Sequence, residues 1–177
     1  MMITMISIML PRANVAAGRI DEVLATEPII RDKDRVLDDQ TDFQGVVQFH
    51  DVSFHYPGAD GNVLEHIDFT AEPGKTTAII GSTGSGKSTL VHLIPRFYDV
   101  TGGSVTIDGV DIRDLSQHKL HSLLGFVPQK GVLFSGDIES NLKFGGEEIS
   151  DEAMQQAAEI AQAGGFIEEE EEGYHSP

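Results

Sequence analysis

The chain has 177 residues, enough for one domain with a hydrophobic core or for one domain and an appendage. It carries 12 Lys and Arg residues against 29 Asp and Glu residues, a formal net charge of −17, which argues against nucleic acid as a partner because nucleic-acid-binding proteins usually present a basic face. The absence of Cys excludes disulfides, thiolate catalysis and Cys-ligated zinc.

Residues 1–27 are predicted to be helical, and Pro11 either starts this helix or kinks a longer one. Apolar residues recur at spacings of three and four and make one stripe: Ala13, Ala16, Ile20 and Leu24. The apolar stretch 1–10 is shorter than a membrane span and lacks the basic start of a signal peptide. Residues 27–43 contain Pro28, are rich in charge and show no clear period, which indicates a linker or an extended crossing segment.

From residue 46 the pattern changes to short runs that are typical of β-structure. Residues 47–56 predict a bent or bulged strand pair, and a turn at 57–62 leads to a second run at 64–69. The run Thr-Thr-Ala-Ile-Ile at 76–80 is short, β-branched and unbroken, as in a strand that is buried on both faces. Beyond it we predict helices at 88–97, 115–123, 135–142 and 150–163, and strands at 105–107 and 124–127. This order of elements indicates an α/β fold with an early antiparallel piece.

The last helix has clear boundary signals. Ser150 is its predicted N-cap, and Gly164 with Gly165 is its predicted stop. The acidic run 168–172 that follows is interpreted as a solvated tail rather than as a cation site.

Residues 81–88 read Gly-Ser-Thr-Gly-Ser-Gly-Lys-Ser and match the phosphate-binding loop G-x-x-x-x-G-K-[ST]. The glycines allow consecutive backbone N–H groups to turn inward and surround phosphate oxygens. Lys87 can reach the β- and γ-phosphates, and the Ser88 hydroxyl can ligate Mg²⁺. The predicted strand before the loop and the predicted helix after it are the context that this mechanism requires.

Other kinds of site receive less support from the sequence. A guanine-reading N-K-x-D motif is absent, and only one arginine, Arg113, lies beyond residue 96 to serve as a kinase lid residue. His118 and His121 share a helix face at a spacing of three, but no third ligand stands at a sensible spacing for a metal. We therefore interpret these two histidines as a solvated pair.

The sequence resembles the nucleotide-binding domain of ABC transporters, specifically the multidrug and lipid exporter type with fused membrane and ATPase domains. The resemblance runs from about residue 45 onward. It rests on five stretches: VSFHYPG (52–58), GSTGSGKST (81–89), RFYDVTGGSVTIDGVDIRDL (96–115), GFVPQKGVLFSGDIESNL (125–142) and EEGYHSP (171–177).

The resemblance implies roles for individual residues with ATP and Mg²⁺ as cofactors. Tyr56 matches the aromatic residue that stacks on adenine, and Thr89 fits a contact to the α-phosphate. Gln129 matches the glutamine that contacts Mg²⁺ or the attacking water, so Lys87 and Gln129 are the expected catalytic residues and Ser88 and Gln129 the expected metal ligands. The remaining expected nucleotide contacts come from the loop itself: Gly81, Ser82, Thr83, Gly84, Ser85 and Gly86.

The resemblance also implies a fold and a domain organisation. We expect a P-loop NTPase core of the ABC ATPase kind with an antiparallel β subdomain, incomplete at its C-terminal end and preceded by an N-terminal helix. Residues 1–27 match the cytosolic end of a transmembrane helix and its extension, residues 28–44 a linker, and residues 45–177 the N-terminal part of the nucleotide-binding domain. The expected location is the cytosolic face of a membrane, and the expected partners are an ABC transmembrane domain and a second ATPase domain.

Several parts that ATP hydrolysis needs in this family are not found in the sequence. It contains no run of four aliphatic residues ending in Asp-Glu and no Leu-Ser-Gly-Gly-Gln signature, and no switch histidine can be assigned. We therefore expect the chain alone to bind Mg-ATP weakly at best without hydrolysing it, which leaves open whether it is an enzyme. The alternatives are a nucleotide-binding regulatory or adaptor piece without a transport role, and a non-functional gene remnant.

Overall fold

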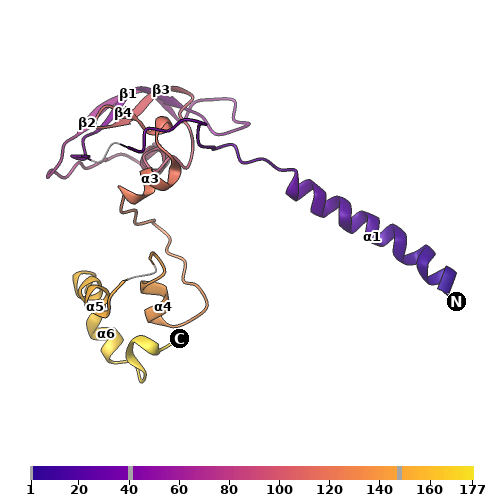
Figure 1. Ribbon diagram of the computed structural model, residues 1–177. Helices are drawn as coiled ribbons and strands as arrows, with labels where there is room; N and C mark the ends of the chain where they lie inside the picture. Colours follow the sequence, from indigo (N-terminus) through magenta and orange to yellow (C-terminus); the bar gives the residue numbers. More distant parts are fainter. Residues whose placement is uncertain (1, 40–41, 147–148) are drawn as a thin grey trace. The chain divides into compact units, whose positions relative to one another are not determined.

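The computed structural model describes residues 2–39, 42–146 and 149–177, and it divides the chain into two compact units, residues 1–126 and 127–177 (Figure 1). We describe each unit by itself. Among the described residues, no helix combines the length and the apolar character that crossing a membrane requires.

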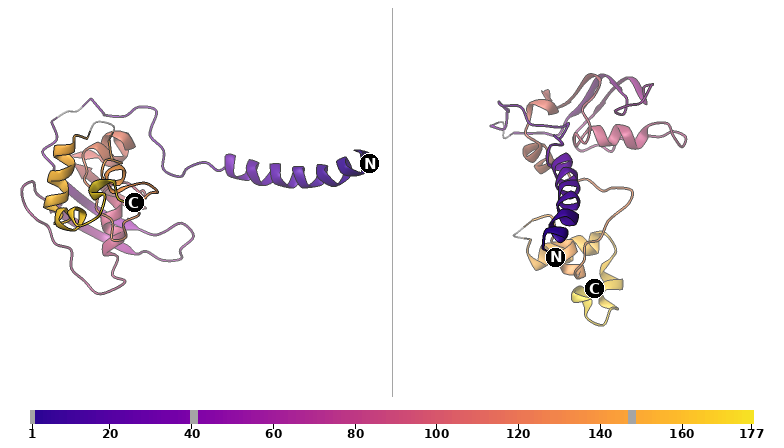
Figure 2. Two further views of the ribbon diagram at one scale, coloured as in Figure 1. Left: turned by 90° about the horizontal axis from the view of Figure 1, so that it is seen from below. Right: turned by 90° about the vertical axis from the view of Figure 1, so that its right-hand side faces the viewer.

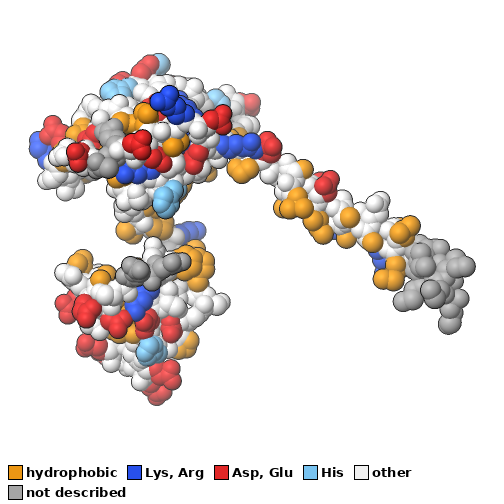
Figure 3. Space-filling view, in the orientation of Figure 1, with side chains coloured by type: hydrophobic (Ala, Val, Ile, Leu, Met, Phe, Trp, Pro, Cys, Tyr) orange, Lys and Arg blue, Asp and Glu red, His pale blue; other side chains and the backbone are white. Residues whose placement is uncertain are grey.

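The first helix, α1 (Met2–Leu24), is continuous and passes through Pro11. Pro11 therefore neither starts the helix nor ends it. The apolar side chains on its described surface are exposed: Met9, Leu10, Val15, Ile20, Val23 and Leu24. Figure 3 shows hydrophobic side chains along this helix in orange.

A four-stranded antiparallel sheet forms the centre of the first unit, with the strand order β2-β1-β3-β4 (Figure 2). Its strands are β1 (Val47–Phe54), β2 (Leu64–Ala71), β3 (Gly102–Ile107) and β4 (Val110–Asp111). The register of β1 shifts between Phe49 and Val52, and Asp51 there has a positive φ of 48°. The expected bent strand pair at 47–56 is therefore one bulged strand that ends at Phe54.

The core of this unit joins the sheet to two short helices, α2 (Lys87–Leu93) and α3 (Gln117–Ser122). Side chains from all of these elements are almost fully buried in one cluster, which includes Phe49, Val52, Phe54, Leu64, Leu93, Val105, Ile107, Leu115 and Leu120. Phe49 also stacks on Phe69 across the β1–β2 pair, with 4.5 Å between the ring centroids. Burial on this scale stabilises the unit because each large aliphatic or aromatic side chain removed from water contributes about 1.5–3 kcal/mol.

The predicted helix at 88–97 is shorter in the structure for a local reason. α2 ends at Leu93, and its C-cap residue Ile94 stands directly before Pro95. A proline disfavours the helical conformation in the residue before it, so helices tend to end there. The chain then turns at Arg96, which has a positive φ of 56°.

Two predicted strands are wrong. Residues 76–80 and 124–127 are not in strands, and Ile80 and Val127 are 90% and 93% exposed. A strand needs a hydrogen-bonded neighbour on at least one side, and none of the described strands pairs with either segment. An apolar, β-branched run can therefore match the pattern of a buried strand without forming one.

In the described part of the second unit, residues 127–146 and 149–177, there are four short helices: α4 (Ile138–Leu142), α5 (Asp151–Ile160), α6 (Gly164–Glu168) and the 3₁₀-helix η2 (Gly173–His175). Its buried apolar residues are Met154, Ala158 and Ile167. The Ser150 side chain accepts a hydrogen bond from the Ala153 N–H, which confirms the predicted N-cap of α5. The predicted stop is wrong: α5 ends at Ile160, and Gly164 begins α6 instead. Residues 168–172 are exposed, as predicted for a solvated run.

Candidate functional site

The glycine-rich loop at 81–86 leads directly into α2, and Gly86 is the N-cap residue of this helix. Gly86 has a φ of +85°, and a Cβ added to it would lie 2.8 Å from the Leu64 Cδ2 atom and 3.2 Å from the Val63 carbonyl oxygen. Only glycine meets both demands, because the left-handed conformation is unfavourable for other residues and β2 approaches too closely for a side chain. The loop therefore fits against the start of β2 at this residue.

The side chain of Lys87, the first residue of α2, folds back onto the loop. Its ammonium group donates hydrogen bonds to the carbonyl oxygens of Gly81, at 2.9 Å, and Ser82, at 2.6 Å. The hydroxyl oxygen of Ser85 lies 3.4 Å from the same nitrogen. The loop thus closes around a positively charged group that the first turn of α2 supplies.

A cavity of about 200 Å³ lies beside the loop and is lined by Val63 and residues 84–89. Its lining includes the ammonium-bearing residue Lys87 and the hydroxyl residues Ser85, Ser88 and Thr89. A lysine with hydroxyl groups and backbone N–H groups around it is the donor set that suits phosphate oxygens. The Ser88 side chain is exposed, so its hydroxyl is free to ligate a hard cation such as Mg²⁺.

Tyr56 lies just beyond the end of β1 and reaches the first turn of α2. Its hydroxyl is 2.9 Å from the Thr89 hydroxyl oxygen, and Thr89 itself is buried. The ring packs edge-on against Phe54 and Tyr98, at centroid separations of 5.0 and 5.2 Å. These contacts hold the Tyr56 ring next to the helix that carries Lys87.

The structure therefore brings together Tyr56 and residues 81–89, which the sequence predicted separately. Gln129 is exposed and belongs to the second unit, so its role stays a prediction. Sequence reasoning missed Val63, which lines the cavity and whose carbonyl oxygen would lie 3.2 Å from a Cβ added to Gly86. No motif marks this valine, and only its place directly before a predicted strand could have drawn attention to it.

The G-x-x-x-x-G-K-[ST] loop at the start of α2 defines the class of P-loop nucleotide-binding proteins, and the strand that usually precedes such a loop is not formed by residues 76–80 here. The model of the ABC transporter family matches residues 64–174. The chain belongs to the ABC transporter family, with the ABC ATPase fold. This finding confirms the predicted family and fold class.

Several known proteins of this family share much of the sequence. An uncharacterized ABC transporter ATP-binding protein of Mycobacterium tuberculosis is 47% identical over 171 residues, which are 95% of this chain and 29% of that protein. An ATP-dependent lipid A-core flippase of Desulfotalea psychrophila is 39% identical over 90% of this chain and 27% of that protein. Multidrug resistance protein 1 of Entamoeba histolytica is 41% identical over 91% of this chain and 13% of that protein.

A solved structure of similar fold is that of a bacterial Atm1-family ABC exporter with ATP bound. It matches with a TM-score of 0.84 and 30% sequence identity, over 99% of this chain and 30% of that chain. The chain thus spans less than a third of the length of the relatives that it matches.

Proposed function

We propose that the loop at 81–89 binds Mg-ATP as part of the nucleotide-binding domain of an exporter-type ABC transporter. The observation that carries this proposal is the closure of the loop around Lys87, whose ammonium is held by the Gly81 and Ser82 carbonyl oxygens. A bound phosphate offers that ammonium negatively charged oxygens in place of neutral carbonyls, and the attraction between opposite charges favours this exchange.

Each residue near the loop has a proposed role. Backbone N–H groups of residues 81–86 and the Lys87 ammonium hold the β- and γ-phosphates, and Thr89 contacts the α-phosphate. The Ser88 hydroxyl ligates Mg²⁺, and Gln129 keeps its proposed role as a contact to Mg²⁺ or to the attacking water. Tyr56 stacks on adenine, supported by its edge-on contacts with Phe54 and Tyr98.

The direct test is ATP binding by the purified chain, measured by isothermal titration calorimetry with Mg²⁺ present. Lys87→Ala is expected to weaken ATP binding at least about tenfold, because a hydrogen bond to a charged group contributes about 1.5–3 kcal/mol. Lys75→Ala is the matched control, since Lys75 is exposed and forms an ion pair with Glu72 outside the cavity. Equal ATP affinity in the two variants would contradict the proposal.

The adenine contact has a separate test. Tyr56→Phe keeps the ring and loses only the hydroxyl contact with Thr89, so ATP affinity is expected to change little. Tyr56→Ala removes the stacking surface and is expected to weaken ATP binding about tenfold, because base–aromatic stacking contributes about 1–3 kcal/mol. Circular dichroism of both variants controls for loss of the aromatic contacts with Phe54 and Tyr98.

We further propose that the chain alone binds ATP without turning it over. The sequence lacks the Asp-Glu run that would supply the catalytic base and a second Mg²⁺ ligand, so no residue is assigned to activate the attacking water. A phosphate-release assay on the purified chain tests this point. Sustained turnover that Lys87→Ala abolishes would show that a base is present.

The setting of the domain is also a proposal. We infer that residues 1–27 continue a transmembrane helix into the cytosol, that residues 28–44 link it to the domain, and that residues 45–177 act with a transmembrane domain and a second ATPase domain in export. The exposed apolar residues of α1 and the printed names of the flippase and multidrug resistance relatives support this view. Co-purification of the chain with a separately expressed ABC transmembrane domain, compared with residues 45–177 alone, tests it.

A further inference from the structure

The segment 28–39, which the sequence predicts as part of a linker, is docked on the first unit, and we call it the strap. Three of its contacts reach the 3₁₀-helix η1 (Ile112–Asp114) and the start of α3. The Leu37 N–H donates to the Asp114 carbonyl oxygen at 2.7 Å, the Asp38 carboxylate accepts from the Ser116 N–H at 2.9 Å, and the Asp32 carboxylate accepts from the Gln117 N–H at 2.9 Å. Lys33 also forms an ion pair with Asp114.

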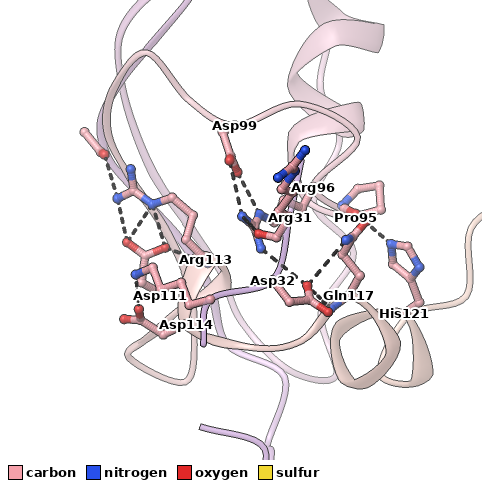
Figure 4. A network of polar contacts seen from close by, with 12 residues as sticks. Arg31, Asp32, Pro95, Arg96, Asp99, Asp111, Arg113, Asp114, Gln117 and His121 are labelled. Atoms are coloured by element: carbon pink, nitrogen blue, oxygen red, sulfur yellow. Dashed lines mark hydrogen bonds and ion pairs between the residues drawn. The ribbon is translucent and has the colours of Figure 1, made fainter. Parts of the chain in front are cut away.

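A buried arginine forms the other side of this docking site. Arg96 is only 4% exposed, and its guanidinium holds Asp99 through two nitrogens, at 2.7 and 3.2 Å (Figure 4). One of these nitrogens, Nη2, also donates to the Arg31 carbonyl oxygen of the strap at 3.1 Å. The remaining nitrogen, Nη1, lies 4.0 Å from Asp32, and among the described residues it has no hydrogen-bond partner.

This incomplete pairing works against docking of the strap. A buried charged donor without a partner carries a desolvation cost that water would remove if the strap were released. Most strap side chains are exposed, and exposed ion pairs add little stability. The strap is therefore held mainly by the hydrogen bonds to Asp114, Ser116, Gln117 and Arg96 described above.

Arg96 connects the strap to the phosphate loop through α2. Its N–H donates to the Leu93 carbonyl oxygen at 3.1 Å, so the turn that carries Arg96 is hydrogen-bonded to the last residue of α2. Lys87, which the loop surrounds, is the first residue of the same helix. The seven residues of α2 span about 10 Å, so the loop leads into one end of this short helix and the strap contacts Arg96, three residues beyond its other end.

We propose that docking of the strap and nucleotide binding to the phosphate loop stabilise each other through α2. The inference rests on the proposed ATP binding. A ligand that orders the first turn of α2 reduces the conformational freedom that docking at its other end must still remove, and the converse holds equally. Such coupling is reciprocal. If bound nucleotide favours docking of the strap by a given factor, release of the strap must weaken nucleotide binding by the same factor.

The test compares Asp32→Ala with Asp34→Ala in the full chain. Asp32 makes the contacts described above, whereas Asp34 is an exposed strap carboxylate outside them, so the two variants change the net charge equally. The measurements are hydrogen exchange of the strap amides, with and without Mg-ATP, and the ATP dissociation constant. We expect Mg-ATP to slow strap exchange in the wild type and in Asp34→Ala. We expect Asp32→Ala to exchange faster without nucleotide and to bind ATP about fivefold more weakly.

The outcomes separate this inference from the proposed function. The coupling alone is overturned if both variants bind ATP with the same affinity and ATP does not change the hydrogen exchange of the strap. Failure of the wild type to bind ATP overturns both proposals. Equal strap exchange in the two variants without nucleotide overturns the docking itself, whatever the result with ATP. Circular dichroism of Asp32→Ala verifies that the sheet is intact.

Discussion

Two segments of the first unit contain similar apolar residues, but only one of them buries these residues. Val105 and Ile107 of β3 are almost fully buried, and residues 47–50 of β1 pair with that strand. Residues 76–80, directly before the phosphate loop, include two isoleucines, yet Ile80 is 90% exposed and the segment is not in a strand. The difference lies in whether the described chain supplies a paired neighbour.

This contrast shows why β-propensity is a weak guide. The preference of β-branched residues for strands reflects packing on a pleated, half-buried surface rather than an intrinsic backbone preference. β3 packs on such a surface, which β1 and the helices α2 and α3 provide. Residues 76–80 have no such surface among the described elements. The phosphate loop is nevertheless closed, because its hydrogen bonds run between residues only a few positions apart.

The largest expected effect compares one isoleucine from each part. Ile107→Ala is expected to lower the free energy of unfolding by about 4 kcal/mol, since it leaves a cavity in the core. Ile80→Ala is expected to change it by less than about 0.5 kcal/mol, as for other exposed positions. Urea unfolding without nucleotide, followed by circular dichroism, measures both. A similar large loss in the two variants would show that residues 76–80 are buried in solution.

The close approach of β3 to the β1 bulge gives the next comparison. A Cβ on Gly103 would lie 2.3 Å from the carbonyl oxygens of His50 and Asp51, and its φ of +73° is unfavourable for other residues. Gly103→Ala is expected to cost about 3 kcal/mol, from backbone strain and steric overlap together. Gly109→Ala, where φ is +81° but no atom lies within 4 Å of the added Cβ, is expected to cost about 1 kcal/mol. Thermal unfolding of both variants measures these losses of stability. Equal losses in Gly103→Ala and Gly109→Ala would contradict the close approach of β3 to the bulge.

Asp108 secures the turn between β3 and β4 to the segment that enters β1. Its carboxylate accepts hydrogen bonds from the N–H groups of Gln44, Gly45 and Val46, at 2.7–2.9 Å. Burial acts to raise the pKa of Asp108, but the three backbone hydrogen bonds outweigh it and lower that pKa below its usual value. Asp108→Ala is expected to lower the free energy of unfolding by about 2 kcal/mol near neutral pH.

The pH dependence of this contribution has a definite sign. Because the pKa of Asp108 is lowered in the folded state, its stabilisation is present above the unfolded pKa of about 3.9 and is lost as the pH falls through the folded value. Asp108→Asn is therefore expected to lose less stability on acidification than the wild type. Asp60→Asn, at an exposed carboxylate of the 57–62 turn, is the control and should follow the wild type.

The smallest expected effect lies at the β1 bulge. The His66 ring nitrogen Nδ1 is 2.6 Å from the Asp51 carboxylate, whose hydrogen bond and charge raise the pKa of His66. The contribution of a raised pKa is fully present below the unfolded value of about 6.5 and is lost as the pH rises through the folded value. His66→Gln should flatten this dependence in thermal unfolding between acidic and mildly basic pH. An unchanged slope would show that the pair does not form in solution.

Local signals predicted the elements whose partners are close in the chain. Ser150 caps α5, and the glycine-rich loop that ends at Gly86 leads into α2, as the residue types indicate. The end of α2 was also readable, since Pro95 gives the boundary that the predicted helix overran. The strap could not be predicted, because its contacts join residues 65 to 85 positions apart and its sequence has no period.

The sequence by itself determined the phosphate loop and the family. These depend on glycine conformations and on hydrogen bonds within a few residues, which residue order alone specifies. Only the tertiary structure decided the strand order, the exposure of residues 76–80 and the docking of the strap on Arg96. These depend on which distant segments meet, and burial and pairing stabilise a segment only when a partner is present to receive it.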